Sequence, residues 1–277
     1  MSVRILDERD GPALRGLAAE QPEINLFLLG NLETLGFTQP FCTFWGDFDE
    51  NAPHGPQLRG VANRYFTGWC VSGHANADWA ALAALIDADE HAERLQDNPG
   101  GTASLLPWLQ RHSAAQVHIE ELMRLRNANF QPQAVPAGWR IHRAGVDDLD
   151  ALTELYADAG DMTRTRAGTE RPLRDGRVYV ARNTRGDIGA VALTNAITHT
   201  TPLLAMMGGV YTPPAQRGLG LSKAVCSALC ESLLADGVTP VLYWKHPAAG
   251  RVYRRLGFQP IGHWRSIWLE PTDVTTQ

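Results

Sequence analysis

Apolar and polar residues alternate, or recur at helical spacing, through most of the second half of the chain. Runs of β-branched, small and aromatic residues between turn residues predict strands at 139–142, 177–182, 188–196, 205–211 and 241–244, and one or two more at 258–269. Apolar positions at helical spacing predict helices at 149–156, 220–235 and 248–256. The turn residues of 159–176 predict a loop. Strands and helices intermixed in this way indicate an α/β fold, a mixed sheet with helices packed on it.

The first half of the chain begins in the same way as the second. Residues 3–6 have the pattern of a short strand, and acidic residues then precede a helical pattern. Residues 139–142 are likewise followed by Asp147 and Asp148 and then by a helical pattern. Acidic side chains suit the positive end of a helix dipole, so both groups of acidic residues indicate helix starts. We therefore predict two related folds in tandem.

A polar, proline-containing stretch at 127–136 is the predicted linker between the halves. The predicted domains are accordingly residues 1–130 and residues 137–270. The tail, 271–277, is expected to be disordered.

Composition and charge narrow the class of protein. Of the 277 residues, 44% are hydrophobic and 20% are charged, as in ordinary soluble proteins, and each half is long enough to bury a core. The net charge of −5 gives no reason to expect nucleic acid or an anionic membrane as a partner. The charged start of the chain lacks the apolar core of a signal peptide, and no apolar run is long enough to span a bilayer. We expect a soluble, cytoplasmic protein, and the oligomeric state stays open.

Two of the four cysteines are spaced in a way that can hold a metal. Cys226 and Cys230 lie one helical turn apart, but only the adjacent Glu231 accompanies them on that helix as a potential ligand. Small apolar side chains surround them in the sequence, and free cysteine is among the most often buried residues. We predict buried thiols and no metal site.

The segment 208–222 carries the chemistry that the sequence predicts. It has the pattern of a strand, a tight turn with two prolines, and then Gly218 and Gly220 at the start of a helix. Glycines let the backbone approach a ligand closely, and the free N–H groups of a first helical turn bind phosphate. The order Gly-Leu-Ser-Lys at 220–223 excludes a Walker loop. The next strand ends at Lys245 instead of an acid, which excludes a dinucleotide-binding fingerprint.

Two blocks of this sequence carry a resemblance to a known family. The run Gln216-Arg217-Gly218-Leu219-Gly220 resembles the Gln/Arg-x-x-Gly-x-Gly/Ala signature of the GNAT N-acetyltransferases, whose loop binds the pyrophosphate of acetyl-CoA. The runs 208–214 and 247–258, the second with a tyrosine just before Leu-Gly-Phe, are similar to bacterial members of that family. The resemblance covers 139–270. It implies an acyltransferase that moves an acetyl group from acetyl-CoA, its co-substrate, to an amine by direct transfer in a ternary complex.

The same resemblance implies roles for single residues. Tyr253 matches the tyrosine that donates a proton to the departing thiolate, whereas a purely structural interpretation has its ring packed in the core. His246 stands where related sequences carry an asparagine that holds pantetheine; here it either offers a similar hydrogen bond or only caps the following helix. In the family, the strand before the loop is splayed from its neighbour and its free N–H groups hold the acetyl and pantetheine portions. The residues implied to bind acetyl-CoA are Val210, Tyr211, Thr212, Gln216, Arg217, Gly218, Leu219, Gly220, Leu221, Ser222 and His246.

The general base is absent from its usual place. Many family members carry a glutamate on the strand that here includes 205–209, and this stretch has no ionisable side chain. Water, Asp161, Glu170 or a group from the first half remain as alternatives.

The first half lacks the phosphate-binding signature. Its nearest counterpart in the sequence is 98–104, which has glycines before a helix but no basic residue, so we expect a degenerate GNAT-like domain that does not bind CoA. The acceptor is expected to be a small-molecule or peptide amine. The alternative to an enzyme is a non-catalytic acyl-CoA-binding or interaction module that retains the fold, which His246 and the missing base favour.

Overall fold

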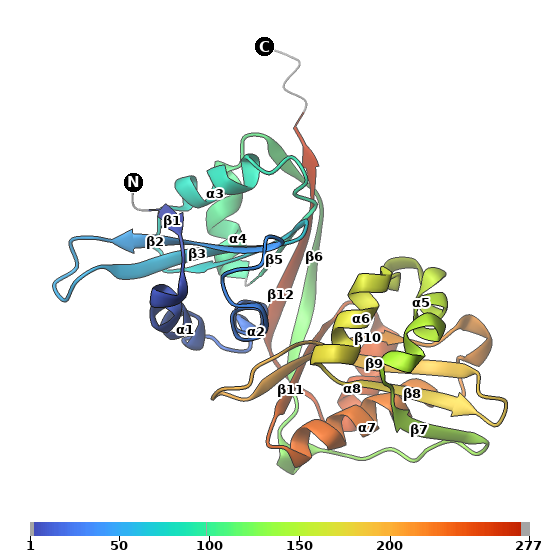
Figure 1. Cartoon of the computed structure of the whole chain (residues 1–277). Helices are drawn as coiled ribbons and strands as arrows, with labels where there is room; N and C mark the ends of the chain where they lie inside the picture. Colours follow the sequence, from blue (N-terminus) through green and yellow to red (C-terminus); the bar gives the residue numbers. More distant parts are fainter. Residues whose placement is uncertain (1–2, 98, 273–277) are drawn as a thin grey trace. The chain divides into compact units, whose positions relative to one another are not determined.

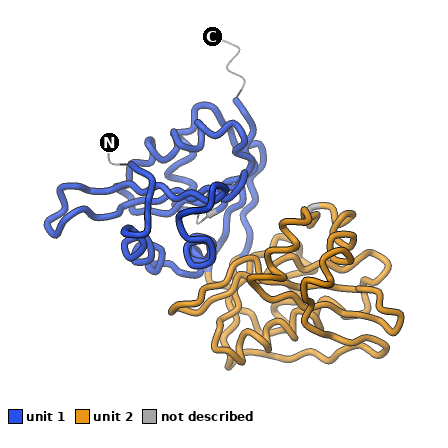
Figure 2. The backbone as a smooth tube through the Cα atoms, viewed as in Figure 1, with its two compact units in different colours: residues 1–121, 262–277 blue, residues 122–261 orange. Residues whose placement is uncertain are grey.

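The computed structural model describes residues 3–97 and 99–272. The chain divides into two compact units, Met1–Glu121 with Gly262–Gln277, and Leu122–Ile261 (Figure 2). These bounds differ from the predicted 1–130 and 137–270 in two ways: the second unit already begins at Leu122, and most of the last strand belongs to the first unit. Strand β12 (Gln259–Pro271) lies antiparallel to β5 (Arg94–Asp97), with Ile267 opposite Leu95.

The two halves contain helices and strands in the same order (Figure 1). The first half comprises β1 (Val3–Ile5), α1 (Gly11–Ala19), α2 (Leu26–Leu35), β2 (Cys42–Asp49), β3 (Gln57–Tyr65), β4 (Gly68–Gly73), α3 (Trp79–Asp87), β5, α4 (Pro99–Leu105) and β6 (His112–Arg124). The second comprises β7 (Trp139–Arg143), α5 (Leu149–Ala157), α6 (Arg166–Asp175), β8 (Val178–Asn183), β9 (Ile188–Ile197), β10 (Leu204–Tyr211), α7 (Leu221–Ala235), β11 (Thr239–Trp244), α8 (Pro247–Leu256) and β12. The predicted α/β fold with two related halves is confirmed.

In the second unit the strands lie in the order β11-β10-β9-β8-β7. Figure 1 shows α5 and α6 on one face of this sheet and α7 on the other. Alternate residues of β9 therefore serve two cores: Ala190 and Ala192 pack in the cluster with α7, whereas Val191 and Leu193 pack in the cluster with α5. The small side chains on one face let the long helix approach the sheet closely.

The first unit is built on the same plan, with strands in the order β1-β2-β3-β4-β5-β12. Leu14 of α1 and Leu28 of α2 pack with Val61 of β3, whereas the next residue of that strand, Ala62, packs with Leu82 of α3. Both units therefore bury a core on each face of their sheet.

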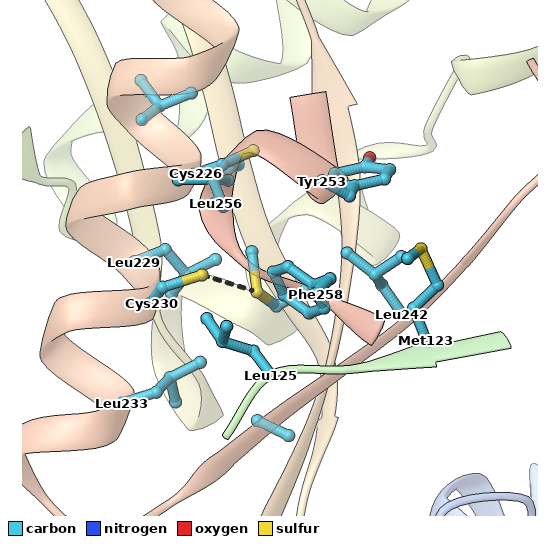
Figure 3. Close-up of a cluster of buried hydrophobic side chains, with 14 of the residues drawn as sticks. Met123, Leu125, Cys226, Leu229, Cys230, Leu233, Leu242, Tyr253, Leu256 and Phe258 are labelled. Atoms are coloured by element: carbon cyan, nitrogen blue, oxygen red, sulfur yellow. Dashed lines mark hydrogen bonds between the residues drawn. The ribbon is translucent and has the colours of Figure 1, made fainter. Parts of the chain in front are cut away.

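The predicted burial of the α7 cysteines is confirmed. Figure 3 shows the Cys226 and Cys230 thiols among buried side chains that include Leu229 and Phe258. The Cys230 sulfur lies 3.6 Å from the sulfur of Met207. Burial raises the pKa of the Cys226 thiol to about 12, so the thiol stays protonated at neutral pH.

Three local predictions were wrong. The expected loop at 159–176 contains α6, whose first turn is capped because the Thr165 hydroxyl accepts a hydrogen bond from the Gly168 N–H at 3.0 Å. The stretch 127–136 is bound to the second unit, since the Gln131 N–H donates to the Leu256 carbonyl at 2.9 Å. The stretch 98–104 is no counterpart of the glycine loop, because α4 follows β5 and so occupies the place of α8. Of the tail predicted to be disordered, 271–277, Pro271 is the last residue of β12, and 273–277 lie outside the described residues.

Within the described residues, no helix has both the length and the apolar character needed to cross a membrane.

Candidate functional site

The site begins where two parallel strands of the second unit separate. Strands β10 and β11 pair at Leu204 with Thr239, Ala205 with Pro240 and Met206 with Val241, and the pairing ends there. Beyond this point β10 continues to Tyr211. Its backbone groups on the side of β11 are therefore left for other partners.

The free part of β10 is also bulged. Its register against β9 shifts between Gly208 and Tyr211, and Gly209 has a φ of +55°, which favours glycine. The hydroxyl of Tyr156, a buried residue of α5, donates a short hydrogen bond to the Gly209 carbonyl. This bond holds the bulge to the helix that covers it.

The loop after β10 leads into α7 through two glycines in the left-handed region. Gly218 has a φ of +82°, and Gly220, the N-cap of α7, has a φ of +83°. Within the described residues, none of the backbone amides from Gly218 to Lys223 donates a hydrogen bond. A side chain on Gly218 would meet no atom within 4 Å, so the backbone there is open to a ligand. Free amides at a helix start form a site for an anion.

A pocket of about 600 Å³ lies between the separated strand, this loop and the start of α8. Ala159 and Met162, from the segment between α5 and α6, close one side of it. Every residue that the sequence predicted for the site lines this pocket except Leu219, whose side chain is 50% exposed. The predicted residues in the lining are Val210, Tyr211, Thr212, Gln216, Arg217, Gly218, Gly220, Leu221, Ser222, His246 and Tyr253.

Two hydroxyl groups of the lining lack partners. The Thr212 hydroxyl oxygen is buried and has no hydrogen-bond partner within the described residues. The Tyr253 hydroxyl likewise has none among those residues, although its ring packs edge-on against Phe258 at 6.0 Å. Burial raises the pKa of Tyr253 well above its ordinary value, so this phenol keeps its proton. Both groups can hydrogen-bond to a ligand in the pocket.

A family model matches part of the second unit. Residues 174–260 match the family model described as Acetyltransferase (GNAT) domain. The chain contains a GNAT domain. The match begins at the end of α6 and includes β8 to β11, α7, α8 and the glycine loop, so it contains most of the pocket lining. Among curated proteins, none matches the sequence of this chain.

Solved structures extend the likeness to both halves. A tandem GNAT protein from the clavulanic acid biosynthesis pathway is 18% identical, with a TM-score of 0.66 over 97% of this chain and 98% of its own. A GCN5-related N-acetyltransferase from Sphaerobacter thermophilus is 17% identical, with a TM-score of 0.63 over 99% and 98%. One from Kribbella flavida is also 17% identical, with a TM-score of 0.57 over 76% and 86%. At these identities the likeness shows the tandem GNAT fold alone.

The first half departs from the GNAT domain at the loop that corresponds to the glycine loop. The counterpart of the glycine loop is 74–78, between β4 and α3, and it contains no glycine. Its last residue, Asp78, caps α3 by accepting a hydrogen bond from the Ala81 N–H at 3.0 Å. A carboxylate therefore already occupies the position at which a phosphate would meet the helix, and the two would repel each other.

His246 and the candidate bases occupy different surroundings. His246 is the N-cap of α8 but makes no side-chain cap, and its side chain lines the pocket. Glu170 is exposed on α6 and is not in the described lining, and the side chain of Asp161 lies outside what the structure describes. The described lining contains no carboxylate. The hydrogen bond from Tyr156 to the bulge was not predicted. An apolar helical pattern does not distinguish a tyrosine that only packs in the core from one whose hydroxyl also donates to a backbone carbonyl.

Proposed function

We propose that the second unit transfers an acetyl group from acetyl-CoA to an amine, by direct attack within a ternary complex. The observation that carries the proposal is the convergence of three features on one pocket. These are the free amides of 218–223, the separated end of β10 and the unpartnered Tyr253 hydroxyl. They supply a phosphate site, a backbone surface for the pantetheine and acetyl portions, and a proton donor.

The reaction then needs no covalent enzyme intermediate. The nitrogen lone pair of the neutral amine attacks the thioester carbon, the C–N bond forms, and the C–S bond breaks as the carbonyl re-forms. A free N–H group near Val210 stabilises the negative charge that develops on the carbonyl oxygen. Tyr253 gives its proton to the departing thiolate, and the proton lost by the amine restores the phenol through water. Cys226 is buried and remains protonated, so it offers no nucleophile.

Calorimetric titration of acetyl-CoA into the protein and into Gly220→Glu tests the site. The new side chain places a negative charge on the phosphate site, so binding in the micromolar range, about −8 kcal/mol, is expected for the wild type and is lost in the variant. Gly237→Glu is the matched control. Gly237 has a similar φ of +74° and no atom within 4 Å of an added side chain, and it lies at the other end of α7. Equal binding by all three proteins contradicts the assigned loop, and binding by none contradicts the proposed co-substrate.

The absence of a carboxylate from the described lining favours one alternative, a module that binds acyl-CoA without turning it over. Tyr253→Phe separates the two functions. If the domain is catalytic, this variant keeps the affinity for acetyl-CoA and loses about 10²–10⁴-fold in turnover, measured by release of free thiol. Binding of acetyl-CoA with no thiol release across a panel of small amines and peptide N-termini supports the module instead. Turnover that is unchanged in Tyr253→Phe removes the tyrosine from the reaction.

A further inference from the structure

A second, smaller hollow adjoins the main pocket of the second unit. Its volume is about 220 Å³, and it is lined by Lys223, Ala248, Arg251, Val252 and Arg255. Ala248 and Val252 also line the main pocket, so the two hollows are direct neighbours. Pockets for whole drug-sized ligands measure about 300–1,000 Å³, so this hollow suits one substituent of a ligand that lies in the main pocket.

The polar lining of this hollow is entirely cationic. Lys223 lies in the first turn of α7, and Arg251 and Arg255 are one turn apart on the same face of α8. None of the three forms an ion pair with a carboxylate of the described residues. The first turns of α7 and α8 contain no acidic residue. Three positive charges that converge without a counter-ion repel one another, and a bound anion relieves that repulsion.

One of the three cations, Lys223, lies directly beside the glycine loop. The Lys223 Cε and Nζ atoms would be 3.6 Å and 3.9 Å from a methyl group built on Gly220. Lys223 is half-buried, whereas Arg251 and Arg255 are exposed. The charge of Lys223 is therefore partly shielded from solvent, which strengthens its attraction for an anion bound at the loop.

We propose that Lys223, Arg251 and Arg255 bind a phosphate monoester, and that this group is the 3′-phosphate of acetyl-CoA. This inference rests on the proposed function, which places the pyrophosphate of the same molecule on the adjacent loop. A phosphate monoester carries a charge of about −1.5 to −2 and three terminal oxygens, which matches three cations from two helices better than a carboxylate does. Recognition of the 3′-phosphate makes the domain selective for CoA thioesters over their 3′-dephospho forms.

Calorimetry with acetyl-CoA and 3′-dephospho-acetyl-CoA on the full chain tests the proposal without knowledge of the acceptor. We expect acetyl-CoA to bind about tenfold more tightly, which corresponds to about 1.4 kcal/mol. In the triple variant Lys223→Gln, Arg251→Gln, Arg255→Gln the ratio falls to about one, while the affinity for the dephospho form stays unchanged. The tenfold ratio also shrinks as salt rises, because two of the cations are exposed. Arg185→Gln, which removes an exposed charge from the hairpin between β8 and β9, keeps the ratio of the wild type.

Each other outcome decides against the proposal in a distinct way. If the wild type binds both thioesters equally, the 3′-phosphate is not recognised, although the acetyl-CoA site stands. If the triple variant weakens both thioesters by the same factor, the cations contact the pyrophosphate, and the assignment to the 3′-phosphate is wrong. If neither thioester binds, the proposed function fails, and the inference fails with it.

Discussion

Replacement of Gly209 by alanine tests how closely the bulge of β10 is packed. A methyl group built on Gly209 would lie 2.8 Å from Leu193 Cγ and 2.9 Å from the Tyr156 hydroxyl oxygen. Both distances are shorter than real contacts of a methyl group, so one of these neighbours must move. The Tyr156 hydroxyl is held by its bond to the carbonyl of the same glycine, and Leu193 is buried in the sheet.

The expected cost has two parts. Alanine at a φ of +55° loses about 1–2 kcal/mol relative to glycine, because its methyl group crowds the backbone. Overpacking of a buried site adds about 1–3 kcal/mol. The free energy of unfolding of the second unit should therefore fall by about 2–5 kcal/mol in Gly209→Ala.

Urea unfolding followed by circular dichroism measures this loss, with Gly237→Ala as the control. Gly237 has a φ of +74° in the same unit and no atom within 4 Å of an added methyl group, so it isolates the conformational cost of about 1–2 kcal/mol. Tyr156→Phe removes the crowded hydroxyl oxygen, so in that background Gly209→Ala should cost less than in the wild type. Equal losses for the two glycine variants, or full additivity with Tyr156→Phe, would refute the close packing of the bulge.

Three further predictions concern single residues. Burial raises the pKa of Cys226 from 9.0 to about 12, so above pH 9 the thiol ionises in the unfolded chain but stays protonated in the native protein. The free energy of unfolding should therefore be unaffected below pH 8 and fall by up to about 1.4 kcal/mol per pH unit between pH 9 and 12. Urea unfolding at a series of pH values measures this slope, which should be shallower in Cys226→Ala. Asp78→Ala removes the α3 cap and should lower the free energy of unfolding of the first unit by about 1 kcal/mol in urea unfolding. Calorimetry should still give one acetyl-CoA per chain, and a second site would contradict the assignment of the first half. Thr212→Val should stabilise the free protein by about 1 kcal/mol in thermal unfolding, because it removes a buried hydroxyl without a partner, and should weaken acetyl-CoA in calorimetry; tighter binding would show that this hydroxyl does not contact the ligand.

The arrangement of helices and strands in the second unit was largely predictable because its patterns are strong. Strand β9 alternates between two cores, and α7 buries one face through Leu221, Val225 and Leu229. Helix α6 was missed because its sequence is polar and has Pro172 inside, so it lacks the apolar repeat on which the prediction depends. The pairing of β12 with β5 could not be predicted from the sequence for a different reason. Alternation in a strand indicates which face is buried but not which strand lies beside it.

The site was predictable where function depends on backbone conformation. Gly218 and Gly220 appear in the sequence because their φ angles exclude other side chains, so the loop is visible without a structure. The cationic hollow was not predictable, because Lys223 lies 28 residues before Arg251 and only the packing of α8 beside α7 brings them together. Charged residues on exposed helix faces have no distinguishing pattern, since most of them are only solvated.

The two halves differ in one connection, the one on which the proposed ligand site depends. In each half two parallel strands pair over only three residue pairs and then separate. The pairing begins at Gly68 with Arg94 in the first half and at Leu204 with Thr239 in the second. The strand geometry is therefore the same in both halves, and it cannot decide which half has the features of the proposed anion site. The connection to the next helix does decide it. The glycine loop leaves the first amides of α7 free, whereas the Asp78 carboxylate accepts a hydrogen bond from an amide of α3 and adds a negative charge. The first half thus has a helix cap at the position where the second half has the free amides on which its proposed anion site rests.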